Sequence, residues 1–287
     1  MLKISKEIRF LICQALREDI GTGDITTEAL VPRGLTGEAS IDVKQSGVLC
    51  GGPVVLEVFR QIDPKLVIKQ KVKDGKKVRK GQAVIFIRGR VQSILKGERV
   101  ALNFLGRLSG ISTLTHEFSK RIRGNKAKIF STRKTTPLWR ELEKYAIRSG
   151  GGKNHRFGLW DEVLVKDNHW VVLKLSPRKL RNLAMARRRK IPIEIEVANL
   201  KELKGLLSGD FCPDRILLDN FSVRELKKAV QIVKHMQPKI LLEASGGITL
   251  SNVREVAKTR VDRISIGALT HSAPALDVSL TLEKINQ

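Results

Sequence analysis

The hydrophobic positions near the start of the chain repeat at helical spacing. Apolar side chains at positions 4, 8, 11, 12, 15 and 16 fall on one face, which predicts an amphipathic helix that ends near Gly21. From there to about residue 90 the pattern changes to strand-like alternation, interrupted by a helical pattern at Val54–Ile62. The alternating segments are residues 39–43, 66–72 and 83–87. These elements predict a small α+β domain.

The second part of the chain alternates between strand and helix patterns. A helical pattern covers Ser93–Leu114, and serines at 176, 222 and 251 are placed to begin later helices. The predicted strands are Ala127–Ser131, Glu162–Lys166, Ile191–Val197, Arg215–Asp219, Ile240–Ala244 and Arg263–Gly267. Alternating strands and helices imply a parallel sheet. Both an open doubly wound sheet and a barrel fit the alternation, but polar residues end nearly every strand, which is typical of α/β barrels.

The charge balance favours anionic partners. The 287 residues include 54 Lys and Arg against 29 Asp and Glu, a formal net charge of +25. Nucleic acid, acidic membrane surfaces and small phosphate- or carboxylate-rich substrates all remain open on charge alone. The densest basic run, Arg178–Lys190, is interpreted as a solvent-facing helix, since no common nucleic-acid-binding motif accompanies it.

The cysteine spacing and the apolar runs indicate a cellular setting. The three cysteines lie far apart without a CxxC pair, which argues against a disulfide scaffold or a zinc site. The N-terminus carries charges too close together for a signal-peptide core, and no apolar run approaches the roughly 18 residues of a membrane span. We expect a cytoplasmic protein.

Two glycine-containing loops follow the last two predicted strands. Backbone N–H groups in such loops bind phosphate in many barrels, and small residues allow the phosphate to come close. An ordinary tight turn is the alternative for each loop taken alone. The candidate residues are Ser245, Gly246, Gly247, Gly267 and Ala268.

Cationic residues gather after the first two strands of this series. Arg133 and Lys134 follow the first strand, His155 and Arg156 precede the second, and Lys166 closes it. Forked arginine donors and compact lysine charges suit a small dicarboxylate. Each of these side chains could instead be a solvated surface cation, but their shared position at strand ends favours a binding site.

Acidic residues occupy the next two strands. Glu194 and Glu196 point to the same side of their strand, opposite Ile193, Ile195 and Val197, and Asp219 ends the following strand. These carboxylates could hold Mg²⁺ or stabilise a developing positive charge. Ion pairing with neighbouring cations is the alternative.

Several of these segments together resemble one family. The matching motifs are Glu18–Thr27, Glu98–Ile111, Thr132–Pro137, Gly150–Arg156, Lys166–His169, Glu194/Glu196, Leu218–Asn220, Glu243–Gly247 and Gly267–His271. In this order, over about residues 17–272, they resemble quinolinate phosphoribosyltransferase, the decarboxylating nicotinate-nucleotide pyrophosphorylase family. The chain departs from the family pattern at Leu138, where a glycine is usual, and at Ala198, where a polar residue often follows the strand.

The resemblance implies an architecture. It is an N-terminal α/β sandwich over residues 1–110, on which the tail 272–287 packs, and an open α/β (TIM-like) barrel over 111–271. Members of the family form homodimers, or assemblies of dimers, in which one chain's N-terminal domain closes its partner's barrel mouth.

The implied activity is phosphoribosyl transfer from phosphoribosyl pyrophosphate to quinolinate, with decarboxylation, in NAD biosynthesis. Nicotinate mononucleotide, pyrophosphate and CO₂ are the products. The alternatives are a molybdenum-transport-associated protein of the same fold, a nicotinate phosphoribosyltransferase, and a basic nucleic-acid-binding protein.

The resemblance also assigns roles to residues. Those implied for quinolinate are Thr132, Arg133, His155, Arg156 and Lys166, with Arg99 from the neighbouring subunit. Those implied for phosphoribosyl pyrophosphate are Lys134, Glu196, Asp219, Ser245, Gly246, Gly247, Gly267, Ala268 and His271. The catalytic group is Lys134, Lys166, Glu196 and Asp219, and the carboxylates Glu196 and Asp219 would hold Mg²⁺, partly through water.

Overall fold

The computed structural model describes residues 2–173, 183, 186, 188–209 and 211–286. The predicted helix start at Ser176 and most of the basic run Arg178–Lys190 lie outside the described residues. The chain divides into two compact units. Unit 1 comprises Met1–His116, Thr136–Gly151 and Thr270–Gln287, and unit 2 comprises Glu117–Thr135 and Gly152–Leu269.

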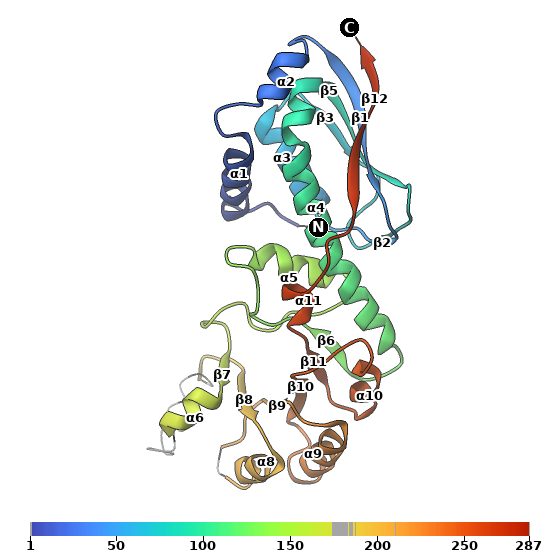
Figure 1. Ribbon diagram of the computed structural model, residues 1–287. Coiled ribbons are helices and arrows are strands. Elements are labelled where there is room, and N and C mark those ends of the chain that lie inside the picture. Colours follow the sequence, from blue (N-terminus) through green and yellow to red (C-terminus); the bar gives the residue numbers. More distant parts are fainter. Residues whose placement is uncertain (1, 174–182, 184–185, 187, 210, 287) are drawn as a thin grey trace. The chain divides into compact units, whose positions relative to one another are not determined.

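Unit 1 is built on an antiparallel sheet with helices on one face (Figure 1). The strand order is β12-β1-β5-β3, and the strands are β1 (Thr36–Val43), β3 (Val67–Gln70), β5 (Ala83–Arg90) and β12 (Val278–Asn286). The covering helices are α1 (Lys6–Ile20), α3 (Gly52–Ile62) and α4 (Val91–Arg121) as far as His116. Apolar side chains from both layers, including Ile41, Phe59 and Ile85, are fully buried between them. The predicted α/β sandwich is confirmed.

Some elements of unit 1 escaped the sequence patterns. The short helix α2 (Ile25–Leu30) begins at an Asp24 side-chain cap, and β2 (Gly47–Val48) pairs with β4 (Lys77–Val78). The tail forms β12, which pairs with β1 from Val43↔Val278 to Thr36↔Asn286. Helix α5 (Arg140–Ser149) completes the unit and follows Leu138. The departure noted at Leu138 has a structural consequence, since this exposed leucine adopts a left-handed φ of 65°, where glycine is the favoured residue.

Unit 2 is a six-stranded parallel sheet with the order β6-β11-β10-β9-β8-β7. The strands are β6 (Lys128–Phe130), β7 (Val163–Val165), β8 (Ile193–Val197), β9 (Arg215–Asp219), β10 (Leu241–Ser245) and β11 (Arg263–Ser265). All six lie within the predicted segments or within one residue of them. No pairing joins the two edge strands, β6 and β7, among the described residues, so the barrel is open. This confirms the predicted fold class.

The helices of unit 2 follow the strands in sequence. They are α6 (Asp167–Leu173), α8 (Leu200–Leu207), α9 (Val223–Met236) and α10 (Val253–Lys258), with α11 (Ala268–His271) at the junction of the two units. The predicted start of α9 is confirmed by a capping box in which Ser222 and Glu225 satisfy each other's backbone N–H groups. The predicted start of α10 at Ser251 is off by one residue, because the helix begins after Asn252.

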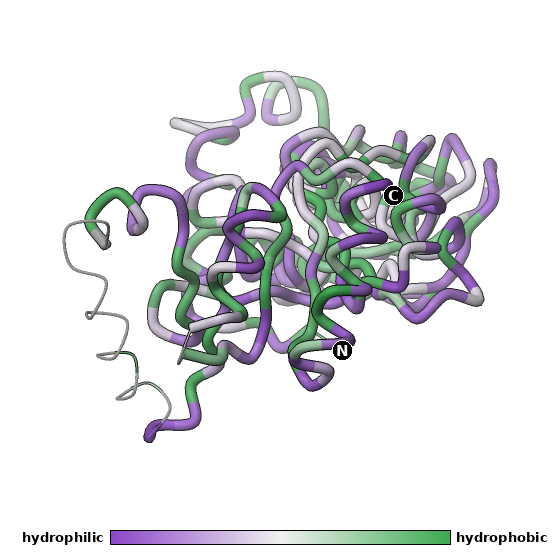
Figure 2. Tube along the Cα trace, turned by 90° about the horizontal axis from the view of Figure 1, so that it is seen from below, coloured by the Kyte–Doolittle hydropathy of each residue, from purple (hydrophilic) through white to green (hydrophobic). Residues whose placement is uncertain are grey.

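Apolar and polar residues alternate at short intervals along the chain (Figure 2). This pattern is expected of elements with one buried and one solvated face. Among the described residues, no helix combines the length and apolar character needed to cross a membrane.

Candidate active site

Most of the predicted site residues of unit 2 lie at the carboxyl ends of its strands. Because the strands are parallel, these ends meet at one edge of the sheet, which we call the rim. The rim residues are Thr132, Arg133 and Lys134 after β6, Lys166 after β7, Glu196 in β8, Asp219 in β9, Ser245, Gly246 and Gly247 at the end of β10, and Gly267 and Ala268 after β11. Arg99 and His271 belong to unit 1, so their participation in this site stays a prediction.

The rim residue Arg133 and the buried Arg156 carry like charges that act on each other. The Arg156 side chain is largely buried, and its Nη1 donates to the backbone oxygen of Glu162 at 3.2 Å. Burial, and then the charge of Arg133, lower the pKa of Arg156. Within the described residues, the buried Nε of Arg133 has no hydrogen-bond partner. The two positive charges repel each other, and one N–H donor of Arg133 is unused. Both features favour the binding of an anion that can accept hydrogen bonds from both arginines.

The rim residue Lys166 forms an ion pair. Lys166 Nζ lies 3.0 Å from Glu196 Oε2, and the Lys166 side chain remains 47% exposed. The indole of Trp170 in α6 donates to the backbone oxygen of Glu196 at 3.1 Å, which fixes the end of β8. An exposed pair of this kind contributes little to stability, about 0–1 kcal/mol, so its charges stay available to a ligand.

The loops after β9 and β10 are in direct contact. Asn220, at a φ of 56°, donates from its side chain to Asp219 at 2.7 Å and from its backbone to the Ser245 oxygen at 2.8 Å. A Cβ on Gly246 would lie 2.1 Å from Asn220 Oδ1, and Gly246 has a φ of 88°. Only glycine fits at position 246. The backbone there is accessible to a close ligand such as a phosphate.

Below the rim, a group of charged side chains is buried among the amino-terminal halves of the strands. We call it the buried layer, and its members are His155, Glu162, Glu194, Arg215 and Glu243. His155 Nε2 lies 2.9 Å from Glu194 Oε2, and Arg215 Nη2 contacts Glu162 Oε1. Glu194, predicted to join the acidic group of the rim, is fully buried and forms ion pairs instead.

The buried layer shifts the titration of its members. Burial lowers the pKa of His155, but the carboxylates of Glu194, Glu243 and Glu162 outweigh it, so the net shift is upward. Burial and the negative charge of Glu194 raise the pKa of Glu243 to about 7. Contacts with His155 and Arg215 outweigh burial at Glu194, and the pKa of that carboxyl falls.

Three members of the buried layer have the spacing of a metal site. Ligand atoms of His155, Glu162 and Glu194 all lie within 4.8 Å of one another. The guanidinium of Arg215, however, contacts Glu162 and lies 3.7 Å from Glu194. A side-chain cation therefore already neutralises these oxygens, and the group does not fit a metal ion. The partly buried carboxylates of Glu196 and Asp219 at the rim fit Mg²⁺ better, because they still reach solvent and Mg²⁺ keeps several waters.

Sequence reasoning missed Glu162, Arg215 and Glu243 as functional candidates. Each is a charged residue within or beside an otherwise apolar strand, which is a signal that could have found them. Their association depends on strand register, which places Glu194 opposite Arg215. This register cannot be predicted from the sequence of any single strand.

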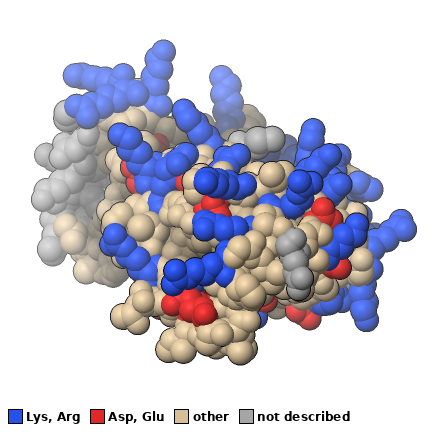
Figure 3. Space-filling model, turned by 90° about the horizontal axis from the view of Figure 1, so that it is seen from above, with Lys and Arg blue, Asp and Glu red and all other residues tan. Residues whose placement is uncertain are grey.

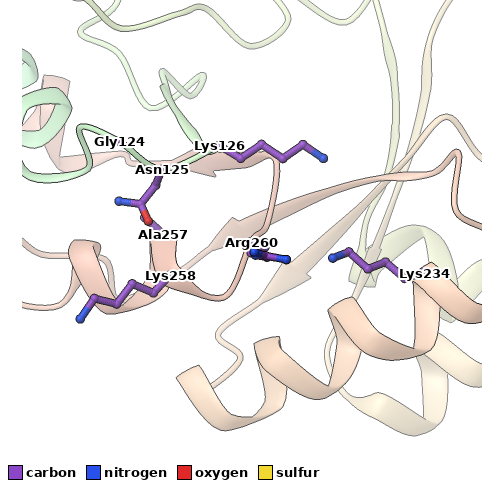
Figure 4. Close-up of a pocket in the computed structure, with 7 residues that line it drawn as sticks. All are labelled: Gly124, Asn125, Lys126, Lys234, Ala257, Lys258 and Arg260. Atoms are coloured by element: carbon purple, nitrogen blue, oxygen red, sulfur yellow. The ribbon is translucent and has the colours of Figure 1, made fainter.

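A basic hollow lies at the end of the strands of unit 2 opposite the rim (Figure 4). Its volume is about 460 Å³, and its lining residues are Gly124, Asn125, Lys126, Lys234, Ala257, Lys258 and Arg260. Lys126 and Lys258 pair with Asp262 and Glu255. The helices α4, α9 and α10 all end next to it, and cations are favourable beside the carbonyl ends of helices. The charges of the hollow are therefore explained without a ligand.

Lys and Arg side chains are numerous on the face drawn in Figure 3, where they form several groups with uncharged and a few acidic residues between them. A nucleic-acid-binding protein is expected to gather such residues into a patch or stripe. The face shown carries several separate basic groups and no single continuous stripe.

Comparisons with known proteins identify the family of this chain. Residues 24–109 match the N-terminal domain, and residues 111–281 the C-terminal domain, of quinolinate phosphoribosyl transferase. The nicotinate-nucleotide pyrophosphorylase [carboxylating] of Mycobacterium leprae is 41% identical over 96% of both chains. Two solved structures superpose closely on this chain. NadC from Streptococcus pyogenes has a TM-score of 0.91 and 35% identity, over 100% of this chain and 99% of that one. The nicotinate-nucleotide pyrophosphorylase of Francisella tularensis has a TM-score of 0.86 and 37% identity, over 96% of both chains. The chain belongs to the quinolinate phosphoribosyl transferase family.

Proposed function

We propose that this chain transfers the phosphoribosyl group of phosphoribosyl pyrophosphate to quinolinate and decarboxylates the adduct. The products are nicotinate mononucleotide, pyrophosphate and CO₂. The observation that carries the assignment is the pair of neighbouring guanidinium groups, Arg133 and Arg156, with a buried Arg133 nitrogen left without a partner among the described residues. A planar pyridine with two adjacent carboxylates supplies the acceptors that this pair needs.

The rim offers separate groups for the two substrates. Arg133, Arg156 and Lys166, with Thr132, form the quinolinate side, where two guanidinium planes fix the ring. The loops at Ser245–Gly247 and Gly267–Ala268 present backbone to the phosphates of the second substrate, and Lys134 adds an exposed positive charge.

Glu196 and Asp219 would hold Mg²⁺ at the rim. Bound there, the ion supplies positive charge against the pyrophosphate leaving group. The same two carboxylates stabilise the ribose carbon as it becomes cationic. Lys166, 3.0 Å from Glu196, holds this carboxylate in place at the rim.

The arginine pair contributes mainly by orientation. Held by Arg133 and Arg156, the pyridine nitrogen faces the ribose carbon and attacks it as pyrophosphate departs. The bond electrons of the adjacent carboxylate then pass into the alkylated, positively charged ring as CO₂ leaves, and the ring carbon that carried this carboxylate takes up a proton from solvent. No further cofactor is needed for that step.

The assembly and setting form part of the same proposal. Arg99 is an exposed residue of α4, suited to reach a neighbouring chain's rim in a homodimer. His271, also exposed, would serve phosphoribosyl pyrophosphate. A cytoplasmic location is supported by three free cysteines.

The test is an assay of the purified chain for CO₂ and pyrophosphate release, with and without Mg²⁺. We expect release only when quinolinate, phosphoribosyl pyrophosphate and Mg²⁺ are all present. Turnover of nicotinate without CO₂ would instead identify a nicotinate phosphoribosyltransferase. Absence of turnover with either acid would favour the molybdenum-transport-associated alternative.

The shared site has its own test. Arg99→Ala mixed with Arg133→Ala should recover part of the activity that each variant lacks, because some mixed dimers contain one intact site. Lack of any recovery would contradict a site completed by the partner.

A further inference from the structure

The buried layer contains a closed circuit of contacts that begins and ends on Arg156. The backbone N–H of Arg156 donates to His155 Nδ1 at 2.7 Å, and His155 Nε2 lies 2.9 Å from Glu194 Oε2. Glu194 Oε2 is 3.7 Å from Arg215 Nε, and Arg215 Nη2 contacts Glu162 Oε1. The backbone oxygen of Glu162 accepts from Arg156 Nη1 at 3.2 Å, which closes the circuit.

The circuit holds Arg156 at two points. One is its backbone, through the imidazole of His155, and the other is its guanidinium, through the Glu162 carbonyl. All members are buried, so water cannot easily replace a lost contact. The Arg156 guanidinium also lies within the repulsive field of Arg133. Without ties, a flexible arginine would rotate away from a like charge.

We propose that Glu194 and Arg215 are positioning residues that set the direction of the Arg156 guanidinium, and through it the binding of the quinolinate carboxylate. This inference rests on the proposed function. Bidentate binding of a carboxylate requires the guanidinium plane to be held to within about 10–20°. Arg215 opens β9 at the amino end of the sheet, so it acts on the substrate only through the circuit.

Arg215→Lys and Glu194→Gln test the proposal by steady-state kinetics. Lysine keeps the charge of Arg215 but loses its fork, and glutamine keeps the shape of Glu194 but loses its charge. For both variants we expect the KM for quinolinate to rise at least tenfold, with the KM for phosphoribosyl pyrophosphate within twofold of wild type. Equal changes in both KM values, together with a lower Tm, would show a merely structural role and overturn the proposal.

Arg263→Lys is the matched control. Arg263 opens β11 as Arg215 opens β9, and it faces Glu243 at 3.9 Å, but it is outside the circuit. We expect both of its KM values to stay within twofold of wild type. In the Arg156→Ala background, Glu194→Gln should add nothing further to the KM for quinolinate, whereas an additive increase would contradict action through Arg156.

A measurement on the folded wild-type chain does not depend on the variants. Because His155 Nδ1 accepts a backbone N–H, its proton should reside on Nε2, facing Glu194. Two-bond proton–nitrogen NMR spectra recorded at a pH where the imidazole is neutral, and assigned by the signal lost in His155→Gln, should report the Nε2–H tautomer. An Nδ1–H tautomer would overturn the circuit. Wild-type chain that fails to turn over quinolinate would contradict the proposed function, while this spectrum would still report on the circuit.

Discussion

The rim and the buried layer are made of the same residue types but use their charges in opposite ways. At the rim, Lys166 and Glu196 form a pair with water on one side. In the buried layer, Glu194 and Glu243 have no exposed surface and are surrounded by His155, Arg215 and Arg263. Exposed charges remain free to exchange partners with a substrate, whereas buried charges are fixed by the cost of leaving any of them unpaired.

Charged residues that are close together on one strand can therefore differ in role, one stabilising the fold and the other serving the site. Glu194 and Glu196 are two positions apart on β8, yet one is buried and the other reaches the rim. We therefore expect mutations in the two regions to separate stability from activity.

The largest expected effect is on stability, in the buried layer. Glu194→Ala leaves Arg215 and His155 without their shared carboxylate, and we expect the free energy of unfolding to fall by about 3–5 kcal/mol. Glu196→Ala should lower it by about 1 kcal/mol or less. Urea denaturation of both variants checks the difference. Equal decreases in the free energy of unfolding for the two variants would contradict the distinction between the rim and the buried layer.

The next effect is on activity, at the rim. Glu196→Ala removes a carboxylate that faces the developing charge, so we expect kcat to fall by about a hundredfold or more. Glu255→Gln is the control, since Glu255 is an exposed ion-pair residue at the far hollow. Near-normal kcat in folded Glu196→Ala would refute the role given to this residue.

The pH dependence of stability should depend on Glu243. Its pKa is raised to about 7, so between about pH 4.5 and pH 7 the folded state keeps a proton that the unfolded state has lost. The free energy of unfolding should therefore decrease as pH rises through this window, with Glu243 contributing on the order of 3 kcal/mol. Denaturation curves at pH 5 and pH 8 should differ less for Glu243→Gln than for wild type. An unchanged difference would contradict the buried titration.

The smallest effect concerns the exposed partner of the rim pair. Lys166→Met should change the free energy of unfolding by about 0.5 kcal/mol or less, because Lys166 is half exposed. The same variant should raise the KM for quinolinate. A stability loss comparable to that of Glu194→Ala would show that the rim is as tightly coupled as the buried layer.

The rim could be predicted from the sequence, and the buried layer could not. Arg133, Lys166 and Asp219 follow or end apolar strands, so their common edge follows from the parallel arrangement alone. Glu162, Arg215 and Glu243 meet only after the register of four strands is fixed, and that register depends on contacts between distant segments.

The fold shows the same division. Helix and strand patterns predicted the six strands of unit 2, because each is a short apolar run with polar ends. Strand β12 was missed although Val278, Leu280 and Leu282 alternate, since its partner β1 lies more than 200 residues earlier in the chain. The departure at Leu138 was visible in the sequence, but its left-handed backbone was not.

The contact between Gly246 and Asn220 limits which substitutions can be accepted at these two positions during evolution. Any side chain at 246 would collide with the Asn220 amide, and Asn220 itself occupies a conformation that few residues tolerate. A lineage could change position 246 only after a smaller residue had appeared at 220, and that intermediate would lack the hold on Asp219. The two loops are thus expected to vary together or not at all.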